Sequence, residues 1–222
     1  MPFVWKDSYN KYIRLQRNNK TFNVEMLTKL ISIQQKDILI INNHLKKYPS
    51  QILDIGCGLG IYDLALHDFY SKKFGSENII FHLLDKTTTE AEEKNVHYGY
   101  REKGAFYNNL DYTKEFLTLN KIKEKNINCI TVDDNLDLTN NYLRNNLSNI
   151  DLVISIISWG FHYPIKVYLD TVYNILADDG LLCLHCRKLS ENLPLLESKF
   201  DIVFPSKENI KEGSFLIMKK KQ

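Results

Sequence analysis

Three glycines at alternate positions, set between two different apolar patterns, constrain the fold of this chain more than any other feature. The stretch 53–60 reads LDIGCGLG. Gln51–Leu53 is a short apolar segment that predicts a buried strand, and Ile61–Leu66 has the apolar spacing of a helix. A glycine-rich turn from a strand into a helix lets a ligand approach the backbone and presents unpaired helix N–H groups to it. The sequence therefore predicts a site for a nucleotide-like ligand at this turn.

The spacing of the loop discriminates among nucleotide ligands. Dinucleotide-binding folds use G-x-G-x-x-G, whereas the sixth position here is Ile61, and no Lys followed by Ser or Thr completes a P-loop. Asp54 stands at the strand end, where a carboxylate repels a pyrophosphate and favours an amine or a sulfonium. These features exclude a P-loop and disfavour a NAD-linked oxidoreductase.

Asp54 followed by G-x-G-x-G resembles motif I of the class I S-adenosylmethionine (SAM) methyltransferases. The resemblance spans residues 50–218, because further acidic residues, Asp151 and a late glycine follow in the family's order. It implies an α/β fold: a three-layer α/β/α Rossmann-like sheet of seven strands in the order 3-2-1-4-5-7-6, mostly parallel with the last strand antiparallel, plus N-terminal helices. It also implies SAM as the methyl donor and S-adenosylhomocysteine (SAH) as the product.

Acidic residues follow the next two expected strands. Asn78–Leu84 ends at Asp85, on the edge where doubly wound sheets bind ligands, so Asp85 is a candidate for the ribose hydroxyls, with a surface helix cap as the alternative. After the strand 129–132, the resemblance places Asp134 at the adenine amine with Asn135 beside the ring, and Asp133 is nearly as good a choice. The cofactor-binding residues expected are Asp54, Gly56, Cys57, Gly58, Gly60, Asp85, Asp134, Asn135 and Ser155.

An aromatic loop follows the fourth expected strand. The run 151–157 is apolar after its first residue and predicts a strand covered on both faces. The loop 158–164 (SWGFHYP) then supplies rings that can wall a site and attract a sulfonium. Its substrate-binding candidates are Trp159, Phe161 and Tyr163. His162 can act as a base near neutral pH and is the candidate catalytic residue, with a structural role as the alternative.

Residues 86–109 are expected to be an insertion beside the site. A loop of this length is usually functional or disordered, and its aromatic content argues against disorder. Tyr98, Tyr100, Arg101 and Lys103 are therefore candidates for holding a sugar or a phosphate. The alternative is a loop pinned in place by its aromatic residues.

The chain divides into two parts. Residues 1–48 have helical spacing and predict one helix near Tyr9–Leu15 and one or two more, either as a cap over the ligand site or packed elsewhere on the sheet. Residues 49–222 form the methyltransferase-like domain as a single unit. Its remaining expected elements are helices at 110–125, 136–147, 167–176 and 189–200, a turn at 177–180, and strands at 181–186, 202–204 and 214–218.

Composition limits the partners and the compartment. With 222 residues and a net charge of +2, the chain has no strong field that recruits nucleic acid or a membrane surface. It contains no membrane span and begins with no signal peptide, which predicts a cytoplasmic protein with reduced cysteines. Cys183 and Cys186 are expected on opposite faces of a strand, so no metal site is expected.

Only a looser resemblance indicates the chemical class of the methyl acceptor. The loop 158–164 is similar to that of small bacterial methyltransferases of surface-polysaccharide pathways, which implies a sugar hydroxyl or a phosphoramidate oxygen of a glycan precursor as the acceptor. The absence of an Asn/Asp-Pro-Pro-Tyr/Phe motif counts against adenine-N6 or glutamine methylation. An RNA methyltransferase and a non-catalytic SAM-binding protein are the alternatives, and the oligomeric state is open.

Overall fold

A mixed sheet of seven strands forms the centre of the computed structural model, which describes residues 2–17, 22–75, 78–87 and 108–221. The strands are β1 Gln51–Ile55, β2 Ile80–Asp85, β3 Ile127–Thr131, β4 Ile150–Ser155, β5 Leu176–Cys186, β6 Phe200–Phe204 and β7 Ser214–Lys220. Their order is β3-β2-β1-β4-β5-β7-β6, and β7 pairs antiparallel with both neighbours. The predicted fold class, strand order and antiparallel last strand are confirmed.

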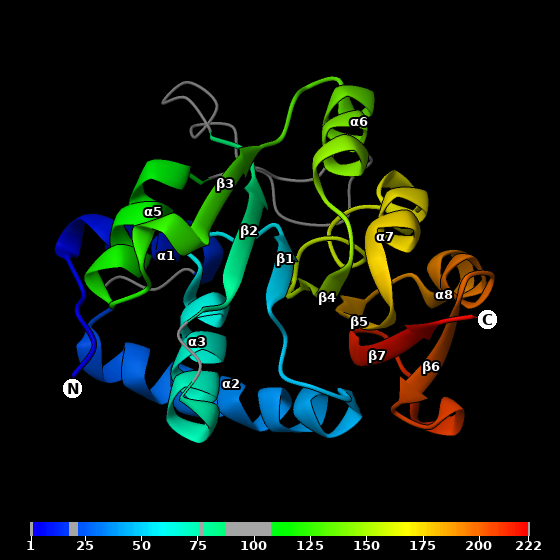
Figure 1. The fold of residues 1–222 in the computed structure, drawn as a ribbon, viewed down its shortest axis with the longest axis horizontal. Helices are drawn as coiled ribbons and strands as arrows, with labels where there is room; N and C mark the ends of the chain where they lie inside the picture. The colour runs from blue at the N-terminus through cyan, green and yellow to red at the C-terminus, as the bar shows by residue number, and fades with distance from the viewer. Residues whose placement is uncertain (1, 18–21, 76–77, 88–107, 222) are drawn as a thin grey trace.

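Helices cover both faces of the sheet. The α-helices are α1 Asn10–Arg17, α2 Val24–His44, α3 Ile61–Phe74, α5 Leu110–Leu119, α6 Leu136–Asn146, α7 Leu169–Ile175 and α8 Leu189–Glu197. Short 3₁₀ turns are η1 Asp7–Tyr9, η2 Glu124–Asn126, η3 Ile165–Val167 and η4 Lys207–Asn209. Alternate strand residues point to opposite faces, so Ile52 packs with the α2, α3 and α5 side, while Leu53 packs with α6, α7 and α8. The result is the three-layer arrangement of Figure 1.

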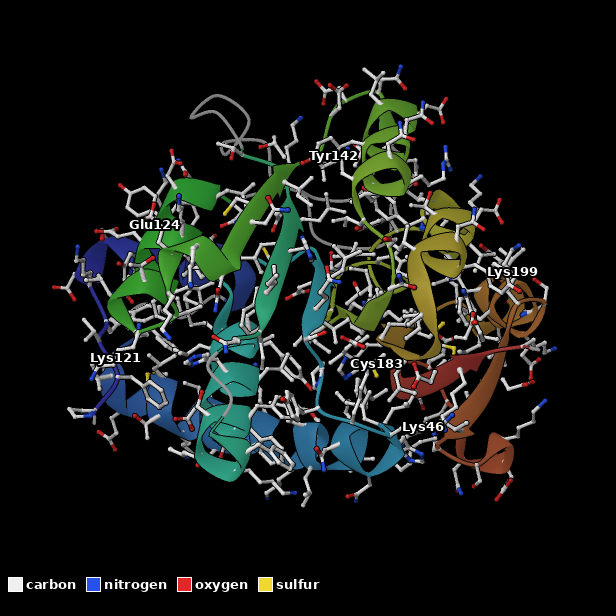
Figure 2. The ribbon with its side chains drawn as sticks, in the orientation of Figure 1. Lys46, Lys121, Glu124, Tyr142, Cys183 and Lys199 are labelled. Atoms are coloured by element: carbon white, nitrogen blue, oxygen red, sulfur yellow. The ribbon has the colours of Figure 1, made fainter. Side chains whose placement is uncertain are left out.

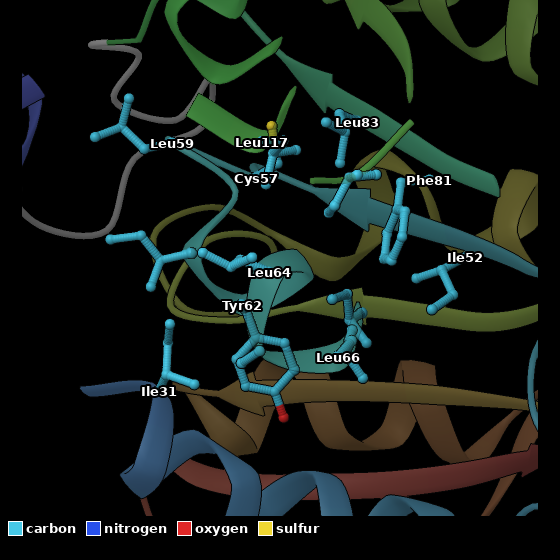
Figure 3. Close-up of a cluster of buried hydrophobic side chains, with 14 of the residues drawn as sticks. Ile31, Ile52, Cys57, Leu59, Tyr62, Leu64, Leu66, Phe81, Leu83 and Leu117 are labelled. Carbon is cyan, nitrogen blue, oxygen red and sulfur yellow. The ribbon is translucent and has the colours of Figure 1, made fainter. Parts of the chain in front are cut away.

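The N-terminal region packs on the first of these faces. Asn23 caps α2 by accepting a hydrogen bond from the Met26 N–H at 2.9 Å, and a single helix then runs for 21 residues where one or two were predicted. Ile31 of α2 meets Tyr62 of α3 in the apolar cluster of Figure 3. In Figure 1, α2 lies along the bottom, whereas the arrowheads of β2 and β3 point to the top. That residues 1–48 cap the ligand site stays a prediction.

Several element boundaries differ from the sequence prediction, most of all at β5 and α5. β5 begins at Leu176, because the segment predicted as a turn at 177–180 stays extended and Leu176 already pairs with Ile150. α5 ends at Leu119, about two turns before the predicted Lys125. Its C-cap Asn120 exchanges hydrogen bonds with the backbone of Val4, at 2.8 and 3.0 Å, and so ties the N-terminal segment to the helix end. Neither boundary has a local sequence signal.

The cysteines are free thiols in the sheet and its loops. Cys183 packs on the α3 face and Cys186 on the α7 face, so the prediction that they point apart is confirmed. Figure 2 places Cys183 in the interior, with Lys121, Glu124 and Lys199 toward the margins. Over the described ranges, no group of three or more His, Cys, Asp or Glu is arranged to hold a metal ion, and no helix is both long and apolar enough to span a membrane.

Candidate functional site

The glycine loop adopts a backbone conformation that side chains rarely tolerate. Gly56, Gly58 and Gly60 have φ values of +78°, +55° and +74°. The Gly56 N–H donates to the Leu84 carbonyl at 2.7 Å, which fastens the turn to the neighbouring strand β2. A Cβ added to Gly56 would lie 1.8 Å from the Ser158 Oγ. The loop after β4 therefore reaches the glycine loop, and only glycine fits between them.

Asp85 ends β2 beside this loop and holds it. Its Oδ2 accepts from the Gly58 N–H at 2.8 Å and from the Asn108 amide at 3.3 Å, and its Oδ1 accepts from the Lys86 N–H at 2.8 Å. Burial raises the pKa of Asp85 to about 6, although these hydrogen bonds lower it. The carboxyl group is thus positioned at the carboxyl edge of the sheet, as predicted.

Two residues that the sequence analysis did not single out complete the loop's support. Asn108 Nδ2 and Thr113 Oγ1 both donate to the Gly58 carbonyl, at 2.7 Å each. Both side chains are buried, and they come from the end of the 86–109 segment and the first turn of α5. No motif marks them, because their role depends on a helix that begins fifty residues after the glycine loop.

A second acidic site lies beneath the loop. Asp54 points to the α3 face and is 3% exposed, and Asp63 in the first turn of α3 is fully buried. Burial raises the pKa of Asp54 well above its ordinary value, with the charge of Asp63 as the next cause, and burial raises that of Asp63 to about 7. The Asp54 and Asp63 carboxyl groups hydrogen-bond to each other, which requires a proton on one of them. Such a pair favours a cationic ligand group.

Cys57 is a buried thiol between these carboxyl groups. Burial, followed by the charges of Asp85 and Asp54, raises its pKa well above the ordinary value. Its Sγ donates to the Gly58 carbonyl at 3.5 Å. Cys57 is therefore a protonated thiol that packs within the loop rather than a nucleophile.

The residues predicted at the adenine are on the surface. Asp134 has a side chain that is 88% exposed and pairs with Lys86 Nζ at 2.7 Å. Asn135 caps α6 by accepting from the Asp137 N–H at 3.1 Å. Asp133 Oδ1 accepts from the Asn135 N–H at 2.7 Å, so all three are engaged with protein partners. Their contact with an adenine ring stays a prediction.

The loop after β4 contains buried side chains that fix its conformation and other side chains that are partly exposed. Ser155 Oγ donates to the Ile55 carbonyl at 2.8 Å and accepts from the Trp159 N–H at 2.8 Å, which fixes the loop to β1. Trp159 is fully buried and its Nε1–H donates to the Ile165 carbonyl at 3.0 Å. Tyr163 is 6% exposed. These three side chains hold the loop in place, which is a structural role that the spacing alone did not reveal.

Phe161 and His162 are half-buried members of this loop. Their rings meet edge to face with centroids 5.1 Å apart. His185 at the end of β5 lies 6.3 Å from the Phe161 ring, and burial lowers its pKa. The Arg187 guanidinium lies over Phe161, with 3.5 Å between its Cζ and the ring centroid. Tyr98, Tyr100, Arg101 and Lys103 fall outside the described residues.

No protein-family model matches the sequence, and no curated protein matches it. Solved structures share its fold. A TDP-rhamnose 3′-O-methyltransferase, an enzyme in calicheamicin biosynthesis, aligns with a TM-score of 0.55 and 12% identity over 98% of this chain and 97% of that one. A methyltransferase from Geobacter sulfurreducens aligns with a TM-score of 0.52 and 14% identity over 98% and 91%. At such identities, the likeness shows the Rossmann-like fold that the chain has in common with these methyltransferases.

Proposed function

We propose that this chain is a SAM-dependent methyltransferase that transfers a methyl group to an oxygen of a small polar acceptor. The observation that carries the proposal is the glycine loop itself: three left-handed glycines lie between a buried carboxyl group at the end of β2 and the buried acidic pair of Asp54 and Asp63. The fold shared with solved methyltransferases supports the same assignment.

The residues present fit the donor. Asp85 is the candidate for the two ribose hydroxyls, because its carboxyl group lies beside Gly58, where parallel strands end. Asp54 is the candidate for the ammonium, because its buried carboxyl group lies near the end of β1, directly before the glycine loop. We assign the adenine end to Asp134 and Asn135. When bound, the donor supplies an electrophilic methyl group on a sulfonium.

On the acceptor side, we assign His162 as the base. A sugar hydroxyl is a poor nucleophile until its proton is being removed, so an imidazole in the loop after β4 suits this acceptor. The structural likeness to a TDP-rhamnose 3′-O-methyltransferase supports a sugar as the acceptor class. Within this proposal the acceptor is a glycan precursor for a bacterial surface polysaccharide, and the enzyme works in the cytoplasm.

The decisive experiment is a methylation screen read by mass spectrometry. SAM labelled in its methyl group is incubated with the protein and with nucleotide sugars, glycan phosphates or total RNA. Label in a sugar product supports the proposal. Label in RNA alone contradicts the acceptor class, and SAH binding without transfer to any acceptor supports a non-catalytic SAM-binding protein.

The role of His162 is tested with the acceptor that this screen identifies. His162→Ala is expected to keep its affinity for SAH and to lose about 10²–10⁴-fold in kcat, the usual contribution of a general base. His162→Gln, which keeps a polar side chain, should lose as much. Full activity in either variant with a hydroxyl acceptor would remove His162 from the chemistry and leave it as part of the wall.

A further inference from the structure

The Arg187 guanidinium stacks on the Phe161 ring near the carboxyl ends of β4 and β5. Phe161 belongs to the loop after β4, and Arg187 directly follows β5. The 3.5 Å between the Arg187 Cζ and the Phe161 centroid is a close cation–π contact. The two segments are also joined through the backbone, because the Arg187 N–H donates to the Gly160 carbonyl at 2.8 Å. The position of the guanidinium is therefore defined by β5, by the loop after β4 and by the ring beneath it.

The positive charge of Arg187 is not neutralised by the part of the chain that the structure describes. The neighbouring Lys188 pairs with Glu191 at 3.5 Å. Glu212 is nearby, but its two oxygens accept the backbone N–H groups of Lys188 and Leu189, at 2.8 and 3.0 Å. Arg187 has an exposed side chain and no ion pair with a described residue. Its guanidinium keeps its N–H donors available for an oxyanion.

Arg187 lies too far along the sheet from the glycine loop to be the partner of the SAM carboxylate. β5 lies two strands from β1, with β4 between them. Neighbouring strands are about 5 Å apart, so Arg187 lies roughly 10 Å along the sheet from the glycine loop. The candidate base His162 contacts the same Phe161 ring at 5.1 Å. Arg187 and His162 therefore lie against the same ring, close enough for one acceptor molecule to contact both.

We propose that Arg187, held on Phe161, binds a phosphate or pyrophosphate group of the acceptor and so positions the acceptor beside His162. The inference rests on the proposed function and specifies its substrate class as phosphorylated, such as a nucleoside-diphosphate sugar. Arginine suits this task because its fork of donors matches two phosphate oxygens at once. Phe161 holds the side chain in place, which reduces the entropy lost when the anion binds.

Inorganic pyrophosphate is the probe that tests this subsite directly. The full chain, labelled with ¹⁵N and loaded with SAH, is titrated while the arginine Nε–H signals are followed by NMR, and the Arg187 signal is assigned as the one missing from Arg187→Met. Pyrophosphate is expected to shift that signal and to bind at least tenfold more weakly to Arg187→Met. Lys188→Met removes the same charge one residue away and should change the affinity by less than twofold. Arg187→Lys should bind weakly, because an ammonium lacks the fork.

Three results would overturn the proposal. Equal losses of pyrophosphate affinity in Arg187→Met and Lys188→Met would mean that the positive charge of this region, and not Arg187 itself, attracts pyrophosphate. A wild-type Arg187 signal that does not shift would mean that no anion binds there. Glucuronate binding as tightly as pyrophosphate, with the same dependence on Arg187, would mean a carboxylate subsite instead. SAH binding is measured first in each variant, and pyrophosphate is also titrated without SAH. A protein that does not bind SAH would contradict the donor assignment, whereas the pyrophosphate titration without SAH tests the Arg187 subsite by itself.

Discussion

At the scale of single residues, Asp85 has two roles, and a single substitution can affect both. Its carboxylate is the candidate for the ribose hydroxyls, and it also accepts hydrogen bonds from the Gly58 N–H and the Asn108 amide. Asp85→Asn keeps an acceptor oxygen for the loop but loses the charge. We expect it to weaken SAH binding by ~1.5–3 kcal/mol, the scale of a hydrogen bond to a charged group. The melting temperature should fall less than in Asp85→Ala, because only the Lys86 N–H loses its acceptor.

Asp85→Ala serves as the comparison in this calorimetric experiment. It leaves a buried N–H and a buried amide without their acceptor, so the melting temperature should fall along with the affinity. SAH dissociation constants that match the wild type in Asp85→Asn would return Asp85 to a purely structural role.

The acidic pair Asp54 and Asp63 predicts a pH dependence of stability. The pKa of Asp63 is raised to about 7 by burial, so its contribution to stability is complete below the unfolded pKa near 4 and is lost as the pH rises through 7. Burial raises the pKa of Asp54 in the same direction. Without ligand, the free energy of unfolding should therefore decrease between about pH 5 and pH 8.

Asp63→Asn tests this dependence by chemical denaturation at both pH values. It removes one buried carboxylate and should raise the free energy of unfolding at pH 8 by about 1–3 kcal/mol, the cost of an unsatisfied buried polar group. The slope with pH should also flatten. Asp178→Asn, at a fully exposed side chain, should leave the slope unchanged. A pH slope that is the same in Asp63→Asn as in the wild type would contradict the assignment.

At the scale of elements, the contact between the glycine loop and the loop after β4 predicts a paired experiment. Gly56 and Gly75 both have positive φ, so alanine at either position strains the backbone by about 1–2 kcal/mol. Only Gly56 has a neighbour in the way, the Ser158 side chain, whereas nothing lies within 4 Å of a Cβ on Gly75. Gly56→Ala should therefore destabilise the protein more than Gly75→Ala does, and should also weaken SAH binding.

Adding Ser158→Gly to Gly56→Ala identifies the cause of that difference. The second substitution removes the colliding atoms and should restore stability, measured by thermal unfolding, to the level of Gly75→Ala. If the double variant is no more stable than Gly56→Ala, steric contact between the two loops is not what requires glycine at position 56.

At the scale of the whole molecule, the donor should stabilise the fold through mass action. A ligand that binds only the native state at one hundred times its dissociation constant adds about 2.7 kcal/mol to the free energy of unfolding. SAH is expected to raise the melting temperature accordingly, and NAD is not. Gly58→Val should lose this shift, while Gly75→Val, at an open position, should keep it. Stabilisation by NAD and not by SAH would overturn the donor assignment.

Local patterns predicted the strand, turn and helix around the glycine loop, and the family resemblance predicted the order of the seven strands. The apolar strand before Gly56, the helix after Gly60 and the acidic residue ending β2 are each encoded within a few neighbouring residues, because strand alternation and glycine turns are local properties. Parallel strands then bring their carboxyl ends to one edge, so Asp54 and Asp85 were predicted to lie together without coordinates. The structure confirms the seven-strand order on which this inference depended.

Only the tertiary structure decided which side chains at that edge have a structural role and which are exposed. Trp159 and Ser155 proved to be buried braces, Asn108 and Thr113 proved to support Gly58, and the guanidinium of Arg187 came to rest on Phe161. Apart from the bond between Ser155 and Trp159 within one loop, these contacts join segments that are distant in sequence, so no local period records them. Burial of Asp63 against Asp54 likewise depends on how α3 docks on the sheet. The sequence predicted the position of a candidate ligand site, and the packing decided which side chains are exposed there.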